Sequence, residues 1–261
     1  MQSEEIEYSE YDTGLLKRRI RNESDRKIFQ DVFDSKTLDT VHKLAEKGLF
    51  DVLDHIVATG KEAHVFIASN AGNTKRAVKV FKRETSDFRK MSEYIEGDRR
   101  FEGYRKDRRN LVLAWVRKEF KNLSIAMEAG LSVPMPLGFE ENVLVMEFIG
   151  NGDKPAPRLK DTRPSGKQLS SYKGQIIDFA ARLYLAGLVH ADLSEYNILV
   201  QKKLVVIDFA QGVLLSHPKA KEFFERDLRN MANYFTRAGL PTEFDDLYAA
   251  VKERKEELNN R

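Results

Sequence analysis

The chain has 261 residues, with 44 basic and 41 acidic side chains and no cysteine. The lack of cysteine excludes a disulfide framework, a thiolate metal site and a cysteine nucleophile. No apolar run approaches the ~20 residues of a membrane-spanning helix, and the polar start Met1–Glu5 is unlike a secretory signal, so we expect a cytoplasmic protein. The net charge of only +3 favours a solvated surface of mixed charge over a nucleic-acid-binding one.

The first third of the chain predicts one helix followed by several strands. After a charged extension without clear periodicity, Asp34 provides an N-cap and Gly48 a C-terminal stop for a short amphipathic helix. Three apolar runs rich in β-branched residues follow, over 52–57, 64–68 and 77–81, and glycine-containing turns separate them. These runs predict neighbouring β-strands.

The remainder of the chain predicts mainly helices. Residues 83–110 are crowded with charges of both signs and lack an apolar stripe wide enough for a core helix, so we expect an exposed, mobile insertion there. Helical spacing then returns, interrupted by two short strands. The expected elements are a helix over 111–129, strands near 137–139 and 143–148, and helices over about 168–186, 218–238 and 243–258.

Strands that come first and helices that come later predict an α+β fold with two lobes. We expect an N-terminal extension and helix over 1–49 and a β-rich N-lobe over 50–149, which carries the mobile insertion 83–110. A short helical C-lobe is expected over 150–261, with a hinge near 148–152.

Two short apolar runs, 198–200 and 204–207, predict a β-hairpin in the second half of the chain, and three oxygen-bearing side chains flank it. Asp192 and Asn197 stand five positions apart before the hairpin, and Asp208 follows it. Each residue alone is of the type that often caps a turn. Together they can converge on one point, and carboxylate and amide oxygens are ligands that Mg²⁺ prefers. The spacing therefore predicts a magnesium site formed by Asn197 and Asp208, beside which Asp192 orients an attacking hydroxyl or water.

These residues lie in segments that resemble protein-kinase motifs. His190–Asn197, H-A-D-L-S-E-Y-N, resembles the kinase catalytic loop, and Asp208-Phe209 resembles the start of the metal-binding D-F-G motif. Lys79, in the A-V-K strand, matches the kinase lysine that pairs with ATP phosphates and with a helix glutamate. Glu119 is the best candidate for that glutamate.

Three departures separate the chain from ordinary protein kinases. The segment at the phosphate-loop position, 58–63, has one glycine and an added Lys61, and Ser194 replaces the usual catalytic-loop lysine. Few residues follow Gly212, which leaves no room for the helices that dock peptide substrates in ordinary kinases.

The departures are themselves the pattern of a family, because the sequence resembles the RIO kinases and in particular their RIO-one branch. The resemblance covers about residues 35–240. It rests on T-G-K-E-A at 59–63, A-V-K at 77–79, K-E-F-x-N-L at 118–123, V-P-x-P at 133–136, M-E-F-I-G at 146–150, H-A-D-L-S-E-Y-N-I-L at 190–199 and I-D-x-x-Q at 207–211.

This resemblance implies an atypical serine/threonine kinase or ATPase that uses ATP with Mg²⁺, for which Mn²⁺ could substitute, and that acts in maturation of the small ribosomal subunit. Asp192 would be catalytic, and Asp208 would be both a metal ligand and the acceptor of the γ-phosphoryl group, as an aspartyl-phosphate. Main-chain groups of Glu147 and Ile149 would bind adenine. The implied ATP-binding set is Val57, Lys61, Lys79, Glu119, Met146, Glu147 and Ile149.

Two other functions stay open at this stage. One is a pseudokinase-like module that binds nucleotide and RNA without turnover, although the intact Asp192, Asn197, Asp208 and Lys79 argue against it. The other is a small-molecule kinase of the choline or aminoglycoside type, which shares H-x-D-x-x-x-x-N but needs a larger C-lobe for its substrate pocket.

Further residues receive predictions of their own. His190 is expected to orient the catalytic loop through its ring N–H, and Asp227 to brace that loop from a helix. Trp115 is expected to be a core residue. The segment Arg99–Arg109 could touch rRNA, or the insertion could be autophosphorylated through Ser86 or Ser92.

Overall fold

The structure is a computed structural model, and it describes residues 17–18, 33–83, 88–101 and 107–260. The chain divides into two compact units, unit 1 and unit 2. Unit 1 takes its described residues from Met1–Phe88, Arg105–Arg117 and Pro136–Pro155, and unit 2 from Arg89–Tyr104, Lys118–Met135 and Ala156–Arg261.

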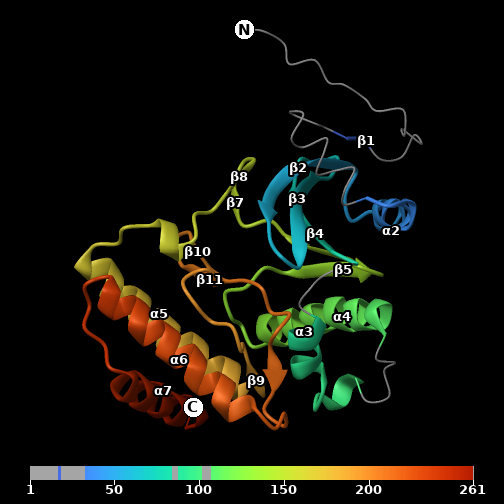
Figure 1. Cartoon of the computed structure of the whole chain (residues 1–261). Helices are drawn as coiled ribbons and strands as arrows, with labels where there is room; N and C mark the ends of the chain where they lie inside the picture. The colour runs from blue at the N-terminus through green and yellow to red at the C-terminus, as the bar shows by residue number, and fades with distance from the viewer. Residues whose placement is uncertain (1–16, 19–32, 84–87, 102–106, 261) are drawn as a thin grey trace, which may run out of the picture. The chain divides into compact units, whose positions relative to one another are not determined.

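Unit 1 is built on a six-stranded sheet with the order β1-β2-β3-β4-β6-β5 (Figure 1). The pair β1–β2 is parallel, and every other neighbouring pair is antiparallel. The strands are β1 (Lys17–Arg18), β2 (Val52–Thr59), β3 (Ala63–Ser69), β4 (Lys75–Phe81), β5 (Pro136–Glu140) and β6 (Val143–Glu147). The strands predicted between residues 52 and 148 are confirmed.

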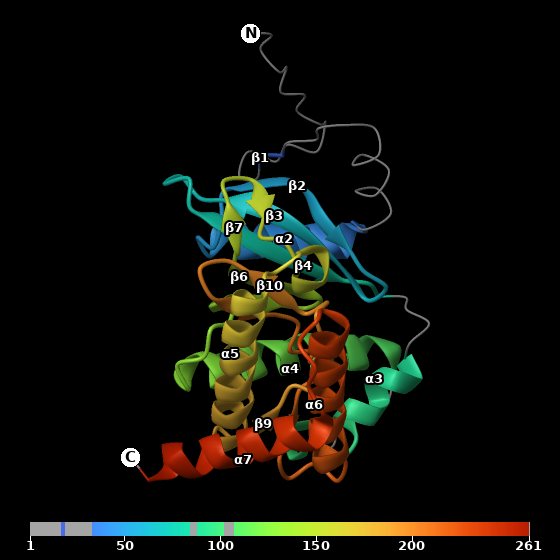
Figure 2. The same ribbon diagram turned by 90° about the vertical axis from the view of Figure 1, so that its left-hand side faces the viewer.

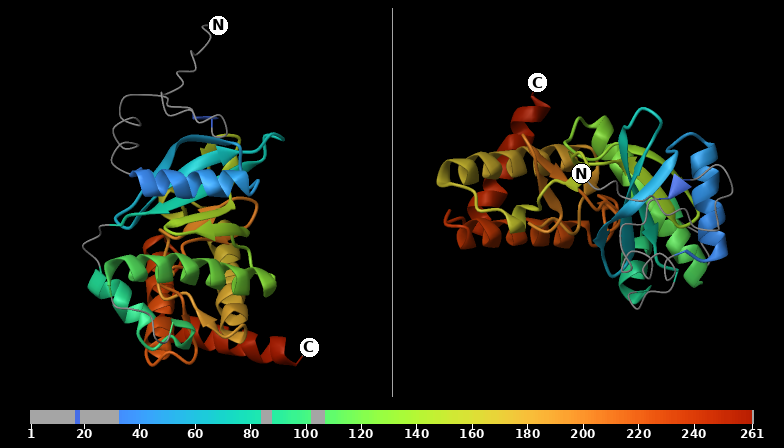
Figure 3. Two further views of the ribbon diagram at one scale, coloured as in Figure 1. Left: turned by 90° about the vertical axis from the view of Figure 1, so that its right-hand side faces the viewer. Right: turned by 90° about the horizontal axis from the view of Figure 1, so that it is seen from above.

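Helix α2 (Ser35–Glu46) lies along one face of this sheet (Figure 3). Its buried side chains join those of the sheet in one apolar cluster, which contains Val41 and Leu44 from the helix and Val78 and Val80 from β4. Successive residues of a strand point to opposite faces. Lys79, between Val78 and Val80, therefore points to the face of the sheet opposite α2.

The ends of α2 are those expected from the sequence. The Asp34 side chain accepts a hydrogen bond from the Thr37 main-chain N–H at 2.7 Å, which satisfies one of the donors that the helix start leaves open. Gly48 follows the helix with a φ of +73°, in the left-handed region that favours glycine. Local sequence therefore sets the length of this helix.

Unit 2 contains three long helices, α5 (Gly166–Leu185), α6 (Ala220–Arg237) and α7 (Phe244–Asn259), and α7 packs on both of the others (Figure 2). Helix α5 begins with a capping box between Ser165 and Gln168. No helix among the described residues is long and apolar enough to cross a membrane. The short elements are a hairpin of β10 (Ile198–Val200) and β11 (Leu204–Val206), the pair β9 (Leu188–Val189) and β12 (Val213–Leu214), and η2 (Leu159–Asp161).

The segment predicted as an insertion without a core helix contains α3 (Phe88–Ile95) and the short 3₁₀ helix η1 (Arg99–Phe101). Met91, Tyr94 and Ile95 of α3 are buried, so the expectation of no core helix is wrong. The apolar stripe spans little more than one turn, and the charged residues on both sides hide it in a longer window. Ser86 lies outside the described residues.

Helix α4 (Arg108–Glu128) contributes to both units, because its residues up to Arg117 belong to unit 1 and those from Lys118 belong to unit 2. Between β6 and α5 the chain forms a small hairpin of β7 (Gly150–Asn151) and β8 (Lys154–Pro155). The predicted lobe boundaries and hinge stay predictions.

Candidate active site

Asn197 folds the loop between β9 and β10 back onto Asp192. The Asn197 side-chain amide donates hydrogen bonds to the Asp192 main-chain oxygen at 2.9 Å and to its carboxylate Oδ2 at 2.7 Å. The Asn197 main-chain N–H donates to the Ser194 oxygen at 3.0 Å. The five-residue spacing that links Asp192 and Asn197 in the sequence thus corresponds to direct contact in the structure.

Asp192 is half-buried and lies near the negative charge of Asp208. Burial, and then the nearby charge of Asp208, raise the pKa of Asp192 to about 6, although the Asn197 hydrogen bond and the charge of Arg226 act in the opposite direction. A carboxylate with a pKa near neutrality suits proton transfer at physiological pH. The interaction also indicates that Asp192 and Asp208 face a common region of unit 2.

Asp208 follows β11 and has a φ of +66°, which is uncommon for a residue with a side chain. The next residue, Phe209, is fully buried and meets the ring of His190 edge-on, with ring centroids 4.6 Å apart. The Ile207 main-chain N–H donates to the Asn197 oxygen at 2.9 Å. These contacts on both sides hold Asp208 beside the catalytic loop.

His190 links the two loops as a neutral side chain. Its Nε2 lies 3.1 Å from the Ile207 oxygen and its Nδ1 lies 3.3 Å from the Asp192 main-chain nitrogen. An N–H must donate to the first and a bare nitrogen must accept from the second, so the neutral ring with its proton on Nε2 satisfies both. Burial lowers the pKa of His190 to about 4. The structural role expected for His190 is confirmed.

Asp227 of α6 braces the catalytic loop, as the sequence analysis proposed. Its carboxylate accepts hydrogen bonds from the main-chain N–H groups of Ala191 at 2.8 Å and Leu193 at 2.9 Å. The adjacent Arg226 donates to the Ala191 oxygen. Burial raises the pKa of Asp227 to about 8, against these hydrogen bonds and the charge of Arg226.

Several candidate phosphate and adenine residues of unit 1 lie on strands of its sheet, and β4 and β6 among these strands are neighbours. Lys79 is buried, with its ammonium 4.9 Å from the centre of the Phe81 ring. Met146 pairs with Ala77 across β4 and β6, and it is buried like Ile149, whereas Glu147 is exposed. Val57 is half-buried near the end of β2. The sheet therefore brings the A-V-K strand next to the M-E-F-I-G segment.

The turn between β2 and β3 carries Lys61, which is exposed. The Gly60 N–H donates to the Ala63 oxygen at 2.9 Å, and the Lys82 ammonium donates to the Gly60 oxygen at 3.0 Å. Glu62 accepts a hydrogen bond from the Trp115 ring N–H at 3.2 Å. Trp115 is buried as expected, but its contact with the turn was not predicted.

Glu119 is fully buried on α4. It belongs to the part of α4 in unit 2, whereas Lys79 belongs to unit 1. The ion pair predicted between them stays a prediction.

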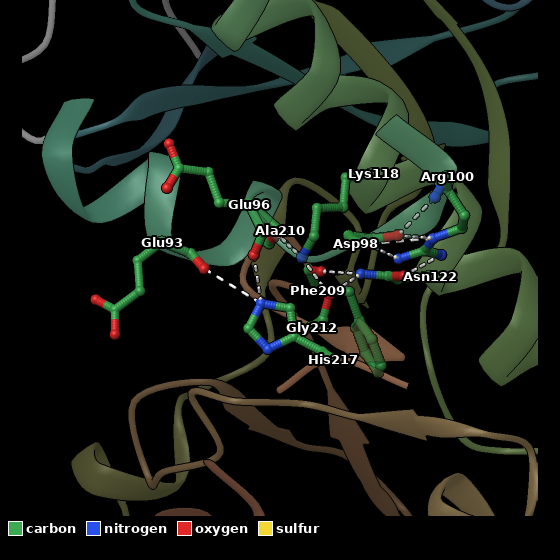
Figure 4. A network of polar contacts seen from close by, with 10 residues as sticks. All are labelled: Glu93, Glu96, Asp98, Arg100, Lys118, Asn122, Phe209, Ala210, Gly212 and His217. Atoms are coloured by element: carbon green, nitrogen blue, oxygen red, sulfur yellow. Dashed lines mark hydrogen bonds and ion pairs between the residues drawn. The ribbon is translucent and has the colours of Figure 1, made fainter. Parts of the chain in front are cut away.

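The residues of α4 that hold the segment after Asp208 were not predicted from the sequence. Lys118 donates from its ammonium to the main-chain oxygens of Ala210, at 3.1 Å, and Gly212 (Figure 4). The Asn122 amide donates to the oxygens of Phe209 and Gly212, both at 2.8 Å. Both residues stand in the K-E-F-x-N-L motif that supported the family resemblance, and that motif was the available signal.

The described residues contain no group of three or more histidine, aspartate or glutamate side chains that could hold a metal ion by itself. A Mg²⁺ ion usually binds through one or two carboxylates and completes its octahedron with waters and phosphate oxygens. The two carboxylates and one amide around the catalytic loop fit an ion that arrives with a nucleotide.

Comparison with known proteins identifies the family of the chain. The family model of the RIO domain matches residues 64–247. The chain is 43% identical to the RIO-type serine/threonine-protein kinase Rio1 of Haloferax volcanii over 241 residues, which cover 92% of this chain and 82% of that protein. It is 42% identical to Rio1 of Methanocaldococcus jannaschii over 245 residues, 93% of this chain and 83% of that protein.

A solved structure supports the fold. The crystal structure of the Rio2 kinase from Chaetomium thermophilum superposes with a TM-score of 0.62 at 20% sequence identity, and the match covers 86% of this chain and 69% of that one. The α+β, protein-kinase-like fold predicted from the sequence, with a β-rich N-lobe and a short helical C-lobe, is confirmed. The chain belongs to the RIO family, in its Rio1 branch, and is a RIO-type serine/threonine-protein kinase that binds ATP.

Proposed function

We propose that the chain transfers the γ-phosphoryl group of Mg-ATP and that Asp192, Asn197 and Asp208 are its reaction centre. The observation that carries this proposal is the direct Asn197–Asp192 contact beside Asp208, whose charge helps to raise the pKa of Asp192 to about 6. In this assignment Asp192 orients the attacking group and accepts its proton.

Asn197 and Asp208 are the proposed metal ligands. The amide nitrogen of Asn197 is directed at Asp192, so its Oδ1 is the atom suited to a cation. Two neighbouring carboxylates that repel one another make a site that a cation stabilises. Bound Mg²⁺, or Mn²⁺ in its place, would offset the negative charge of the phosphate oxygens.

The proposed nucleotide ligands come from unit 1 and α4. Lys79, supported by Glu119, and Lys61 bind phosphate oxygens. Main-chain groups of Glu147 and Ile149 bind adenine, and Met146 and Val57 contact the base or sugar. Support comes from the pairing of β4, which carries Lys79, with β6, which carries Met146 and Glu147, and from the family, and charge favours the two lysines as phosphate ligands.

Asp208 is also proposed to accept the phosphoryl group. One of its carboxylate oxygens attacks the γ-phosphorus, the bond from that phosphorus to the β–γ bridging oxygen breaks, and ADP leaves with that oxygen. Water then attacks the phosphorus and gives a proton to Asp192, the bond from the phosphorus to the Asp208 oxygen breaks, and inorganic phosphate leaves while Asp208 returns to its carboxylate form. A Rio2 structure from Chaetomium thermophilum is a complex with ADP, Mg²⁺ and phosphoaspartate. That complex supports our proposal of the same chemistry for the present chain.

We further propose that the chain is cytoplasmic and that its partner is the precursor of the small ribosomal subunit, as the family resemblance implies. The chain then acts as an ATP-driven switch on a ribonucleoprotein. Its test compares ATP hydrolysis with and without purified precursor particles. Equal rates, without binding to the particles, would contradict this part of the proposal.

The test of the reaction centre compares the wild type with Asp192→Ala and Asp208→Asn. Loss of a general base lowers turnover by roughly 10²–10⁴-fold, so Asp192→Ala should lose γ-phosphate release. Asp161→Asn is the matched control, because Asp161 is an exposed acid on η2. Unchanged turnover in Asp192→Ala would refute the assignment, and a wild type without turnover would favour the pseudokinase alternative.

Mass spectrometry after turnover locates the phosphate. A label on Asp208 that hydroxylamine removes, and that Asp208→Asn lacks, is the expected result. An acid-stable, hydroxylamine-resistant label on a serine would instead indicate phosphoserine and would exclude the aspartyl-phosphate as the accumulating species.

A further inference from the structure

A residue with strained backbone lies at each of the two proposed catalytic aspartates. Ala191, which precedes Asp192, has a φ of +63°, and Asp208 itself has a φ of +66°. A residue with a side chain in this region costs of order 1–3 kcal/mol unless its surroundings enforce the conformation. The contacts that hold these two positions are therefore candidates for positioning the reaction centre.

The Asp208 loop is held through Asn122 and Lys118, and Asn122 is itself oriented by Arg100 of η1 (Figure 4). The Arg100 guanidinium donates to Asn122 Oδ1 at 2.8 Å. This contact turns the other end of the amide, the donor Nδ2, toward the oxygens of Phe209 and Gly212. Arg100 thus determines which way the Asn122 amide faces.

Asp98 holds Arg100 in place. Its buried carboxylate accepts from Arg100 Nη2 at 2.6 Å and from Nε at 2.9 and 3.2 Å. Burial acts to raise the pKa of Asp98, but these hydrogen bonds and the charge of Arg100 outweigh it, so the pKa is lowered. Several hydrogen bonds between the guanidinium and the buried carboxylate fix the geometry of this ion pair, unlike that of a single contact on the surface.

The loop of Ala191 is held through Arg226, which contacts α3. The Arg226 Nη2 donates to the Ala191 oxygen and to the Tyr94 hydroxyl oxygen, the latter at 3.2 Å. Tyr94 stacks on Phe223 with ring centroids 5.0 Å apart, and the Arg226 guanidinium lies 4.6 Å from the same ring. Tyr94 therefore orients the arginine that holds the residue before Asp192.

The α3–η1 segment, Phe88–Phe101, is fixed on unit 2 by further contacts. His217 Nε2 lies 2.9 Å from the Glu96 oxygen and 3.2 Å from the Glu93 oxygen at the end of α3. The turn between α3 and η1 passes so close to Pro218 that a Cβ at Gly97 would lie 2.8 Å from its Cδ, and the φ of +93° there also favours glycine. The segment is packed tightly rather than resting on the surface.

We propose that the α3–η1 segment is a positioning element of the phosphoryl-transfer site, which acts on both catalytic loops at once. Tyr94 acts through Arg226 on Ala191 and Asp192, and Arg100 acts through Asn122 on the Asp208 loop. All are positioning residues, because none is assigned a contact with ATP. This inference rests on the proposed function, since it concerns the efficiency of the same reaction.

The test uses two conservative variants, each with a matched control. Tyr94→Phe keeps the stacked ring and removes the oxygen that accepts from Arg226, and its control is Tyr234→Phe, which removes a buried hydroxyl without a partner among the described residues. Arg100→Lys keeps the charge and removes the forked contact, and its control is Arg99→Lys at the exposed neighbour.

Each test variant should lower kcat about tenfold while KM for ATP changes less than about twofold, because positioning of the reacting groups affects the transition state more than nucleotide binding. The controls should match the wild type. In an Arg226→Lys background, Tyr94→Phe should cause little further loss, because Tyr94 acts through that arginine. Independent, multiplicative losses would contradict this route.

A second readout needs no nucleotide. Alanine-methyl NMR of the free chain should show shifts of the Ala191 resonance in Tyr94→Phe and of the Ala210 resonance in Arg100→Lys, and neither shift in the controls. Test variants that match their controls in kcat and in both resonances, while Asp192→Ala is inactive, would overturn the inference and leave the proposed function standing. An inactive wild type would instead refute the proposed function.

Discussion

Three ionisable side chains lie buried around the loops of Asp192 and Asp208, and each forms hydrogen bonds with main-chain groups of these loops. Asp227 accepts from two N–H groups of the catalytic loop, Lys118 donates to two oxygens after Asp208, and His190 bonds to one group of each loop. A buried polar group that loses its partners costs about 1–3 kcal/mol or more. These residues therefore couple the shape of the site to the stability of unit 2.

His190 leads to a pH prediction at this scale. Its folded-state pKa is lowered from 6.5 to about 4, so the unfolded chain takes up the proton first as the pH falls. The stability that His190 contributes is complete above pH ~6.5 and is lost progressively toward pH ~4, by up to about 3 kcal/mol. The destabilisation caused by His190→Gln should therefore be large at neutral pH and shrink on acidification.

Urea denaturation of the wild type and of His190→Gln at several pH values checks this prediction. The difference between the two proteins is the quantity to follow, because Asp227, whose folded-state pKa is raised, titrates in the opposite sense in both. His42→Gln, at a half-buried position on α2, is the control. A difference that stays constant between pH 7.5 and 4.5 would contradict the buried neutral ring.

At the scale of elements, α4 carries contacts to two loops assigned to the site. In unit 1 its Trp115 donates to Glu62 in the turn that carries Lys61, and in unit 2 its Lys118 and Asn122 hold the segment after Asp208. The residues at these positions sit three and four apart along the helix, as residues of adjacent turns do. One helix thus supports both the turn that carries Lys61, a proposed phosphate ligand, and the loop that carries Asp208, a proposed metal ligand.

Trp115→Phe should separate these two roles. The ring still fills the core, but Glu62 loses a donor, and the phosphate turn loses one of its anchors. Loss of a hydrogen bond to a charged group is worth about 1.5–3 kcal/mol at most, so KM for ATP should rise about five- to tenfold with little change in kcat.

Steady-state kinetics measures this effect, and Glu62→Ala provides the check. In a Glu62→Ala background, Trp115→Phe should add nothing to KM, because the partner is already missing. A fall in kcat at constant KM would assign Trp115 to the reaction step instead.

At the scale of the whole molecule, the chain combines a six-stranded sheet, antiparallel except for the β1–β2 pair, with a helical unit, and it belongs to a family of atypical kinases. The apolar cluster that contains Val41, Leu44, Val78 and Val80 lies within unit 1, and the residues proposed for ATP binding are drawn from both units. Within the described residues no cage of acids and histidines holds a metal ion. Metal binding is therefore expected to depend on the nucleotide rather than on folding.

Metal removal tests this expectation. A chelator should abolish ATP turnover, but it should leave the Tm of the nucleotide-free chain unchanged, because the ion contributes nothing to the free fold. Adding ATP should raise the Tm more with Mg²⁺ than without it. A fall in the Tm of the nucleotide-free chain on chelation would indicate a structural metal site instead.

Local pattern was sufficient for most of the fold. The caps of α2, the apolar runs of β2–β6 and the spacing of α4–α7 are properties of short segments, and these elements were predicted to within a few residues. The failure at α3 has a physical cause, because a helix of little more than two turns owes its stability to tertiary packing rather than to its own sequence. Tyr94 packs on Phe223 of α6, which no window around residue 90 contains.

The sequence by itself determined the family, the kinase-like fold and the identity of the candidate residues Asp192, Asn197, Asp208 and Lys79, because those residues stand in contiguous motifs. Only the tertiary structure decided how the two loops are held. Arg100 meets Asn122 across 22 positions and Asn122 meets Gly212 across 90, and contacts between residues so far apart leave no periodic trace in the chain. The packing around the strained Ala191 and Asp208 can therefore be seen only in the tertiary structure, whereas the chemical groups of the motif can be identified from the sequence.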